Sequence, residues 1–321
     1  GPAAVSGEYF GESATSVARE SGGRVLVGTA SHSGGGLLRY LPDGRLDPAF
    51  GTGGIVHTAP FDGVLALAVA PGGDLVAAGI SYDECRLVLA RFTPDGTLDT
   101  AFAGGAGSLQ ISRGAGPCHP HPVQLAVRPD GRIVVAGSWQ YNFVVEASRA
   151  GAIDHDFGRH GRSGVLQVIP DRVRALALDS RGRILVGGTA RHRLAVTRLT
   201  ARGYLDRGFG RDGTASTAFG RQAEATALAL QPNGDVVAAG VAKKTCGNPG
   251  SLCTQTMPLV ARYLPDGAPD RRFGSHGLWS ARIGTAAGLS AVSVGPRSIT
   301  AVGWAARPGT SRDTLALRLN G

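Results

Sequence analysis

The stretch Leu41-Pro42-Asp43-Gly44-Arg45-Leu46-Asp47-Pro48-Ala49-Phe50-Gly51 decides the fold, because versions of it recur along the chain. It returns as Thr93-Pro94-Asp95-Gly96-Thr97-Leu98-Asp99-Thr100-Ala101-Phe102, and in looser form at residues 151–158, 203–210 and 265–274. The turn glycines of the five copies are 52, 55, 52 and 64 residues apart. A period of this length indicates an array of similar supersecondary units.

Three short apolar runs precede each copy of the motif. In the second repeat they are residues 64–70, 75–80 and 86–92, bounded by Gly, Pro and Asp. This pattern predicts strands joined by tight turns. A fourth run follows Phe-Gly, as at residues 54–58. Four antiparallel strands in each repeat of about 50 residues are typical of a β-propeller blade.

The repeats predict an all-β chain with one six-bladed propeller over residues 3–321, after a Gly1-Pro2 segment that is interpreted as a tag scar. The last repeat stops after its third strand, at residues 315–320. We expect residues 3–10 to supply its outer strand and close the ring, because closure removes exposed strand edges. The repeats start near residues 14, 65, 123, 173, 225 and 289.

The Pro-Asp-Gly-x-Leu-Asp-x-x-Phe-Gly core, together with the preceding Gly-Gly-x-Leu-Val-Ala-Ala-Gly strand at residues 72–79, resembles the delta-60 repeat of bacterial surface and secreted proteins. The resemblance covers nearly the whole chain and implies a β-propeller. It implies no activity, because it brings no catalytic or ligand-binding residue with it. The third repeat departs from the pattern, since Glu146 stands where other repeats have an arginine: Arg39, Arg91, Arg198, Arg262 and Arg318.

The chain carries a net charge of +9, and twelve of its arginines fall between residues 159 and 211. A basic protein attracts acidic partners such as anionic polysaccharides, cell-wall polymers or nucleic acid. Nucleic acid is not favoured, because the chain has no reading motif and no strand that mixes aromatic and basic residues. No run approaches the roughly 20 apolar residues of a membrane-spanning helix. We expect a monomer.

The four cysteines, Cys85, Cys118, Cys246 and Cys253, form no Cys-x-x-Cys metal pattern. An even number of cysteines in loops favours disulfides and an oxidising compartment, and hence a secreted or cell-surface protein. Loops of one propeller face at the same blade boundary carry Cys85 and Cys118, whereas Cys246 and Cys253 flank a single insert. We therefore predict the pairs 85–118 and 246–253, with four free thiols as the alternative.

Two kinds of connection share one face of the predicted propeller: those between second and third strands, and those between blades. We call this face the loop end, and the face with the repeated Gly-Gly and Pro-Asp-Gly turns the turn end. Binding sites concentrate on variable loops carried by a rigid scaffold. We expect the ligand-binding residues at the loop end: Asp62, Tyr82, His119, His121, Trp139, Tyr141, Asp171, Arg172, Arg191, His192 and Trp304.

Carboxylates occupy aligned positions before the innermost strands, namely Glu12, Asp62 and Asp171, with Glu224 one position along. They would ring the mouth of the central channel, where converging oxygens suit Ca²⁺, the candidate cofactor. The alternative is that they are separate, solvated turn residues.

Histidines and aromatic residues give two further hypotheses for the loop end. His119 and His121, with His32 and His192 in other loops, suggest a Zn²⁺ or Cu²⁺ site, but such a site needs three or four converging ligands. Exposed aromatic rings suit sugar stacking or protein recognition, or else pack against neighbouring loops. These rings are Tyr82, Trp139, Tyr141 and Trp304.

The motif also repeats an aspartate, which occurs once in each blade and far from the channel axis, so we predict a structural role. Each should bind local backbone or the arginine eight residues earlier. Glu146 would break that pair in the third repeat, with Arg149 as the substitute partner of Asp154. The five aspartates are Asp47, Asp99, Asp154, Asp206 and Asp270.

The chain contains no hydrolase nucleophile motif, no His-Glu-x-x-His, no phosphate-binding loop and no dinucleotide fingerprint. The leading hypothesis is a binding module that recognises a glycan or a protein at the loop end. The alternatives are a hydrolase or lyase with a metal-assisted site at the channel mouth, and a structural spacer within a larger surface protein.

Overall fold

The computed structural model describes residues 13–30, 34–57, 61–81, 86–113, 123–138, 142–158, 165–167, 171–245, 254–308 and 312–320. These residues form β-strands, joined by turns and by two short 3-10 segments, Ser21–Gly23 and Phe102–Gly105. None of the described segments is a helix long and apolar enough to cross a membrane. The chain divides into two compact units, Gly1–Val165 and Leu166–Gly321.

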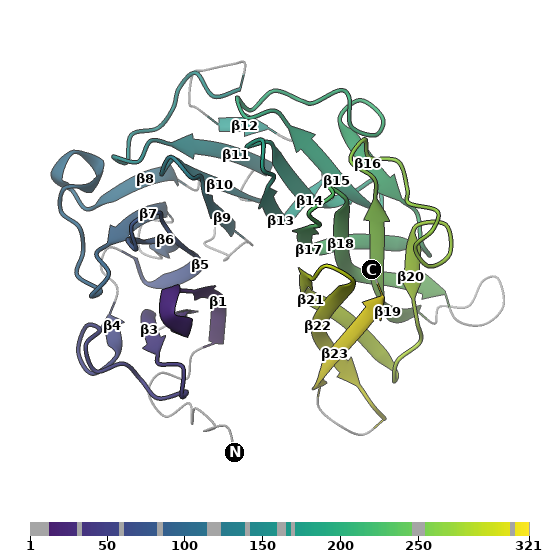
Figure 1. Ribbon diagram of the computed structural model, residues 1–321, viewed down its shortest axis with the longest axis horizontal. Coiled ribbons are helices and arrows are strands. Elements are labelled where there is room, and N and C mark those ends of the chain that lie inside the picture. Colours follow the sequence, from purple (N-terminus) through teal and green to yellow (C-terminus); the bar gives the residue numbers. More distant parts are fainter. Residues whose placement is uncertain are drawn as a thin grey trace. The chain divides into compact units, whose positions relative to one another are not determined.

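The strands form successive antiparallel groups in chain order (Figure 1), as the repeats predict. Strand group 1 contains β1 (Ser13–Arg19), β2 (Val25–Ala30), β3 (Gly36–Tyr40) and β4 (Ile55–His57). Strand group 2 contains β5 (Gly63–Val69), β6 (Leu75–Ser81), β7 (Arg86–Phe92) and β8 (Ser108–Arg113). Strand group 3 contains β9 (Val123–Val127), β10 (Ile133–Ser138), β11 (Asn142–Ala147) and β12 (Val165–Gln167).

The second half of the chain continues the pattern. Strand group 4 contains β13 (Arg172–Leu178), β14 (Ile184–Ala190), β15 (Arg193–Leu199) and β16 (Thr214–Thr217). Strand group 5 contains β17 (Gln222–Leu230), β18 (Val236–Thr245), β19 (Thr254–Tyr263) and β20 (Leu278–Ser280). Strand group 6 contains β21 (Ala286–Val294), β22 (Ser298–Ala306) and β23 (Arg312–Asn320), three strands among the described residues.

Groups 1 and 2 touch along one edge, where the residue pair Ala30 and Gly63 links β2 to β5. The other groups are separate sheets. Ring closure by residues 3–10 falls outside the described residues, which begin at residue 13.

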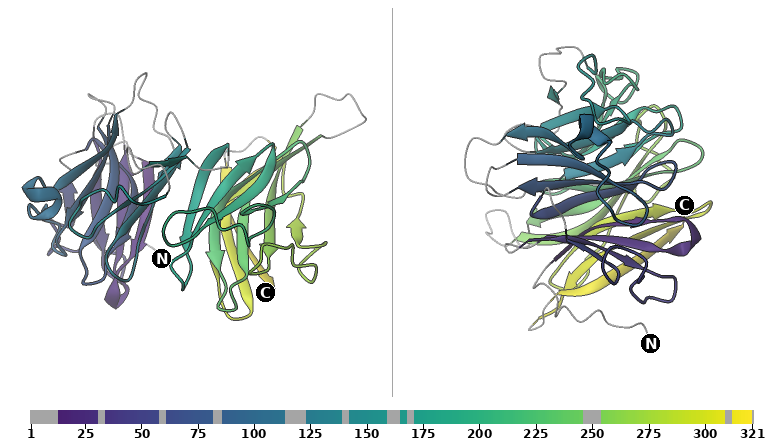
Figure 2. Two further views of the ribbon diagram at one scale, coloured as in Figure 1. Left: turned by 90° about the horizontal axis from the view of Figure 1, so that it is seen from above. Right: turned by 90° about the vertical axis from the view of Figure 1, so that its left-hand side faces the viewer.

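The hydrophobic core lies between neighbouring strand groups, because the strands carry apolar residues on both faces. Between groups 2 and 3, for example, Val76 and Leu89 belong to the same buried cluster as Val135 and Val145. Figure 2 shows the strands of each unit running between two ends of that unit. Sheets stacked in this way hold the connections at both ends in fixed positions.

The motif aspartates are structural, as the sequence predicts. In four strand groups the third-strand arginine donates from Nε to the aspartate eight residues later, at 2.6–2.9 Å. The other carboxylate oxygen of each aspartate accepts a backbone N–H two residues on, and Asp154 in group 3 does the same. Each of the four guanidinium groups also lies 4.4–5.0 Å from the ring centre of the motif phenylalanine.

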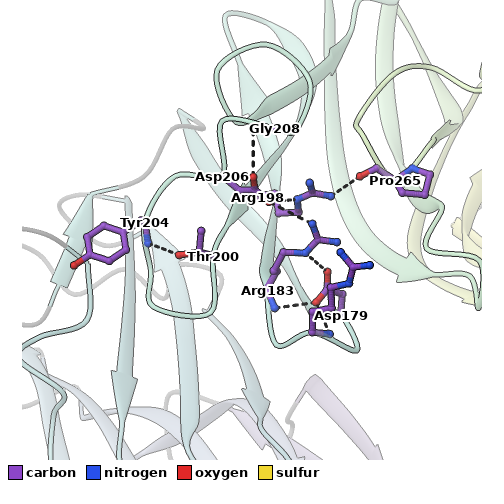
Figure 3. A network of polar contacts seen from close by, with 9 residues as sticks. Asp179, Arg183, Arg198, Thr200, Tyr204, Asp206, Gly208 and Pro265 are labelled. Carbon is purple, nitrogen blue, oxygen red and sulfur yellow. Dashed lines mark hydrogen bonds and ion pairs between the residues drawn. The ribbon is translucent and has the colours of Figure 1, made fainter.

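Three of these four arginines also connect their group to the next one, which the sequence did not predict. Nη1 of Arg39 donates to the carbonyl of Pro94, Nη1 of Arg91 to that of Arg149 at 2.6 Å, and Nη1 of Arg198 to that of Pro265 at 2.5 Å (Figure 3). Each acceptor lies two residues before the turn glycine of the following group. The motif therefore joins neighbouring sheets as well as shaping one turn.

Group 3 corrects one prediction, because no ion pair joins Arg149 to Asp154 among the described residues, and Glu146 has two arginine partners of its own. The side chain is fully buried and accepts from Nε of Arg128 at 2.6 Å and from Nη1 of Arg132 at 2.8 Å. Both arginines belong to the turn between the first two strands of the same group. Arg149 instead contributes its backbone carbonyl to Arg91. Group 3 therefore buries a negative side chain where the other groups have an arginine, and two arginines of the same group pair with it.

Candidate functional site

Exposed basic side chains gather at the loop end of the second unit. There, β13, β17 and β21 begin and β14, β18 and β22 end, so the residues at these positions share one end. The exposed acidic residues at this end are Asp171 and Asp313. The exposed lysines and arginines, which we call the loop-end cations, are Arg172, Arg191, Arg193, Arg221, Lys243, Lys244, Arg282, Arg307 and Arg312.

Backbone hydrogen bonds hold several of these cations beside one another. The carbonyl of His192 accepts from the N–H of Ala223, which joins the β14–β15 hairpin to the start of β17. The N–H of Arg221 donates to the carbonyl of Lys243 at 2.7 Å. In group 6 the N–H of Thr285 donates to the carbonyl of Ala306, one residue before Arg307. The chain therefore fixes the positions of these cations through regular backbone structure.

Asp171 shapes the hairpin that carries two of the predicted ligand-binding residues. Its Oδ2 accepts the N–H of Arg191 at 2.7 Å. Arg191 and His192 form the hairpin tip with φ of 50° and 63°, a conformation that side chains with a Cβ seldom adopt. The carboxylate of Asp171 thus stabilises a strained tip that exposes Arg191 and His192 to solvent.

Glu224 pairs with the preceding strand group, and the backbone of Asp62 is bonded within its own group. Glu224 accepts from Nε of Arg174 at 2.8 Å, and the N–H of Asp62 donates to the carbonyl of Ile80. Among the residues that the structure describes, no three His, Cys, Asp or Glu side chains come together as metal ligands would. The Ca²⁺ hypothesis therefore remains a prediction, with Glu12 outside the described residues.

Trp304 lies at the end of β22, at the loop end as predicted. The guanidinium of Arg312 lies 4.1 Å from its ring centre. A similar contact at the end of group 5 places Nζ of Lys244 5.9 Å from the ring of Phe219. In both cases a cation lies over the aromatic face, which favours its position by about 0.5–1 kcal/mol at an exposed site.

Several predicted residues lie outside the described ones, so the structure assigns them no position. They are Glu12, His32, Tyr82, His119, His121, Trp139, Tyr141 and the cysteines Cys85, Cys118, Cys246 and Cys253.

Charge is divided unequally between the two units. Residues 166–321 contain 21 of the 33 lysines and arginines but 9 of the 24 acidic residues, which gives them +12 against −3 for residues 1–165. When buried and exposed residues are counted alike, the loop end of the second unit has ten cations and three acidic residues, because Arg174 and Glu224 also lie there, and the turn end has eleven arginines and six aspartates. The net charge is therefore +7 at the loop end and +5 at the turn end.

The turn end of the second unit has a pocket that the sequence did not predict. It measures about 650 Å³ and lies between groups 4 and 5, with Arg181, Arg183, Arg198, Gln231 and Asp266 in its wall. Much of that wall is an internal ion-pair network, in which Arg183 donates to Asp179 at 2.6 Å and lies 3.4 Å from Asp206 (Figure 3). Burial, together with nearby Arg183, lowers the pKa of Arg198.

A second pocket, of about 680 Å³, lies on the other side of the β17–β18 turn and contains Arg262, Arg271 and Arg272. Its buried arginine is paired with Asp270. Reading the repeats position by position could have revealed these networks. The residue after the first strand and the third-strand residue have opposite charges in repeats 3 and 4, where they are Arg128 with Glu146 and Asp179 with Arg198.

Comparison with known proteins supports the fold and leaves the function open. A family model described as a beta-propeller domain of unknown function, DUF5122, matches residues 21–50 and 71–102. No curated protein matches the chain.

Solved structures of several proteins share the fold at low sequence identity. Virginiamycin B lyase from Staphylococcus aureus is 10% identical, with a TM-score of 0.54 over 94% of this chain and 83% of the lyase. A protein from Lactobacillus plantarum is 14% identical, with a TM-score of 0.51 over 95% of this chain and 84% of that protein. Hydrazine synthase from Kuenenia stuttgartiensis is 9% identical, with a TM-score of 0.51 over 90% and 76%. The chain has a β-propeller fold, and at these identities the likeness extends to the fold alone.

Proposed function

We propose that this protein is a secreted or cell-surface binding module that holds a glycan or a protein ligand at its loop end. The observation that carries the proposal is the set of nine exposed loop-end cations, accompanied by two exposed acidic residues, at the strand ends and connections of one end of the sheets. Connections of this kind are where ligand-binding residues concentrate, and exposed arginine is a common interface residue.

The architecture that we propose for the module is a single six-bladed propeller in which residues 3–10 complete strand group 6. The strand count supports it, because group 6 has three described strands whereas each of the other groups has four. Deletion of residues 1–10 should lower the melting temperature, and an unchanged melting temperature would contradict closure.

The proposal is tested with the purified protein on immobilised neutral glycans, acidic glycans and proteins, with the metal content and any reaction products measured in parallel. Binding without turnover supports a module, whereas cleavage of a bound glycan together with a stoichiometric metal would favour the hydrolase or lyase. A variant pair locates the site. The substitutions Arg172→Ala with His192→Asn change the loop end, and asparagine suits the positive φ of residue 192.

The matched control changes two exposed arginines of the turn end, with Arg202→Ala and Arg207→Ala. We expect the loop-end pair to weaken ligand binding and the turn-end pair to leave it unchanged. The reverse pattern would place the site at the turn end and overturn the proposal.

A further inference from the structure

The second unit carries more basic than acidic residues, so its internal ion pairs cannot neutralise all of its positive charge. Its turn-end arginines alternate with aspartates and several are paired, as in the contacts of Arg183, Arg198 and Arg262. The loop-end cations have two acidic neighbours at the same end. Of these, Asp171 bonds the backbone of Arg191, and Asp313 lies 3.6 Å from Arg307. Arg193 donates to Ser216 of its own group. Arg172, Arg221 and Lys243 are exposed to solvent, where a ligand can reach them.

The cations also come from several chain segments in three successive strand groups. Arg172, Arg191 and Arg193 belong to group 4, Arg221 and the two lysines lie at the start and the second strand of group 5, and the others belong to group 6 or its approach. A ligand that neutralises many of them must extend across the ends of several sheets. This requirement favours a polymer with repeated negative charges over a small anion.

The aromatic residues at this end distinguish between kinds of polymer. Single-stranded nucleic acids bind by stacking bases on open aromatic faces. Here the rings of Trp304 and Phe219 have the cations of Arg312 and Lys244 over them. At the described part of the loop end, these two rings are therefore covered by cations and are not open for base stacking. A polymer that displays its anionic groups along its outside fits this surface better than one that must stack.

From these observations we infer that the loop end of residues 166–321 binds a linear anionic polysaccharide. Sulfate and carboxylate groups share the chemistry that the arginines recognise, since both accept bidentate hydrogen bonds from a guanidinium group. The inference rests on the proposed binding function and names the chemical class of its ligand. Binding should weaken as salt rises, because each ion pair releases counterions from the polymer.

The test compares two triple variants with equal changes in net charge. R172E/R221E/K243E reverses three loop-end cations, and R207E/R211E/R271E reverses three exposed arginines at the turn end of the same unit. Affinity is measured for heparin, for polygalacturonate, for neutral dextran, for a DNA duplex and for a panel of neutral glycans and proteins, at two salt concentrations. Thermal melting checks that both variants are folded.

We expect heparin or polygalacturonate to bind the parent protein, with the two probes separating sulfate from carboxylate recognition. The loop-end variant should lose at least about tenfold in affinity, with a shallower salt dependence, and the turn-end variant should lose much less. Equal losses in both variants would show an effect of total charge and overturn the inference. Tighter binding to the DNA duplex than to either polysaccharide would also overturn it.

The affinity measurements with neutral glycans and proteins distinguish a failure of this inference from a failure of the proposed function. Binding to a neutral glycan or a protein, without binding to either anionic polysaccharide, would refute the anionic ligand and leave the binding module standing. The absence of binding in every arm would refute both.

Discussion

Arg39 and Asp47 form a buried ion pair, with Nε of the arginine donating to Oδ2 of the aspartate at 2.9 Å. Their side chains are 4% and 8% exposed, and Glu20 lies 3.9 Å from the same guanidinium group. The same arginine donates to the carbonyl of Pro94 in the next strand group. One side chain therefore joins a turn, a strand and the neighbouring sheet.

Removing this arginine should be costly, because Asp47 would be left buried without its cation and Glu20 would keep only Arg24, at 3.8 Å. We expect Arg39→Met to lower the free energy of unfolding by about 3 kcal/mol. Asp47→Asn keeps the oxygen that accepts the N–H of Ala49 and should cost less. In a double-mutant cycle by denaturant unfolding, the coupling energy should be about 1–3 kcal/mol. Additive effects would show that the pair contributes nothing specific.

The turn glycines provide a matched test of packing between strand groups. Gly96 has a φ of 92°, and a Cβ there would lie 2.5 Å from Val56 and 2.8 Å from Phe50 of the preceding group. Gly44 has a similar φ of 86° but no atom within 4 Å of such a Cβ. Gly44→Ala should thus cost about 1 kcal/mol of backbone strain, and Gly96→Ala about 1–3 kcal/mol more from overpacking. Equal losses of unfolding free energy would refute this account.

Strand group 3 has a buried glutamate where other groups have an arginine. We therefore expect that two further substitutions restore the stability that Glu146→Arg removes. Glu146→Arg should destabilise the protein by about 3 kcal/mol, because it would remove the carboxylate that pairs with buried Arg128 and would bury a second positive charge beside it. Strand group 2 has Ala70, Asp74 and Arg91 at the equivalent positions. The triple variant R128A/R132D/E146R copies that set, and its denaturant midpoint should return toward that of the parent. A single Glu146→Arg variant as stable as the parent would contradict the interpretation.

Tyr263 predicts a loss of stability at high pH. Burial raises the pKa of its hydroxyl to about 12, above the ordinary value of 10.0, and the hydroxyl is bonded to Thr217 at 2.6 Å. The folded protein holds this proton more tightly than the unfolded chain. The stabilisation is therefore complete below pH 10 and is lost between pH 10 and 12.

The size of this effect should be about 2–3 kcal/mol over that interval. The measurement is the difference in unfolding free energy between the parent and Tyr263→Phe at several pH values. Phenylalanine does not titrate, so the difference should shrink by that amount as the pH rises from 9 to 12. A constant difference would show that Tyr263 does not ionise with a raised pKa.

The sequence predicted the strand groups because their signals are local. Each Pro-Asp-Gly turn and each short apolar run lies within about ten residues, and the partner of Arg39 lies eight residues away at Asp47. The contacts from Arg39 to Pro94 and from Arg198 to Pro265 span 55 and 67 residues. Contacts of that length depend on how the sheets stack, so the motif alone could not predict them.

The loop end was predicted in outline, from the alternation of strand directions. Arg172, Arg191, His192 and Trp304 lie at the end where they were expected. The roles of Asp171 and Glu224 were not predicted, since a hairpin N–H and the side chain of Arg174 satisfy them. The arginine cluster was visible in the sequence, but its division between a paired turn end and a freer loop end depends on which strand each residue follows.

Hydrogen-exchange mass spectrometry with and without heparin tests the central claim, that the loop end of the second unit is the binding surface, most directly. We predict that protection on binding is concentrated in residues 190–193, 217–222 and 241–245, which carry most of the group 4 and group 5 cations. Protection centred instead on the turn-end residues 179–183 and 265–272 would contradict the account.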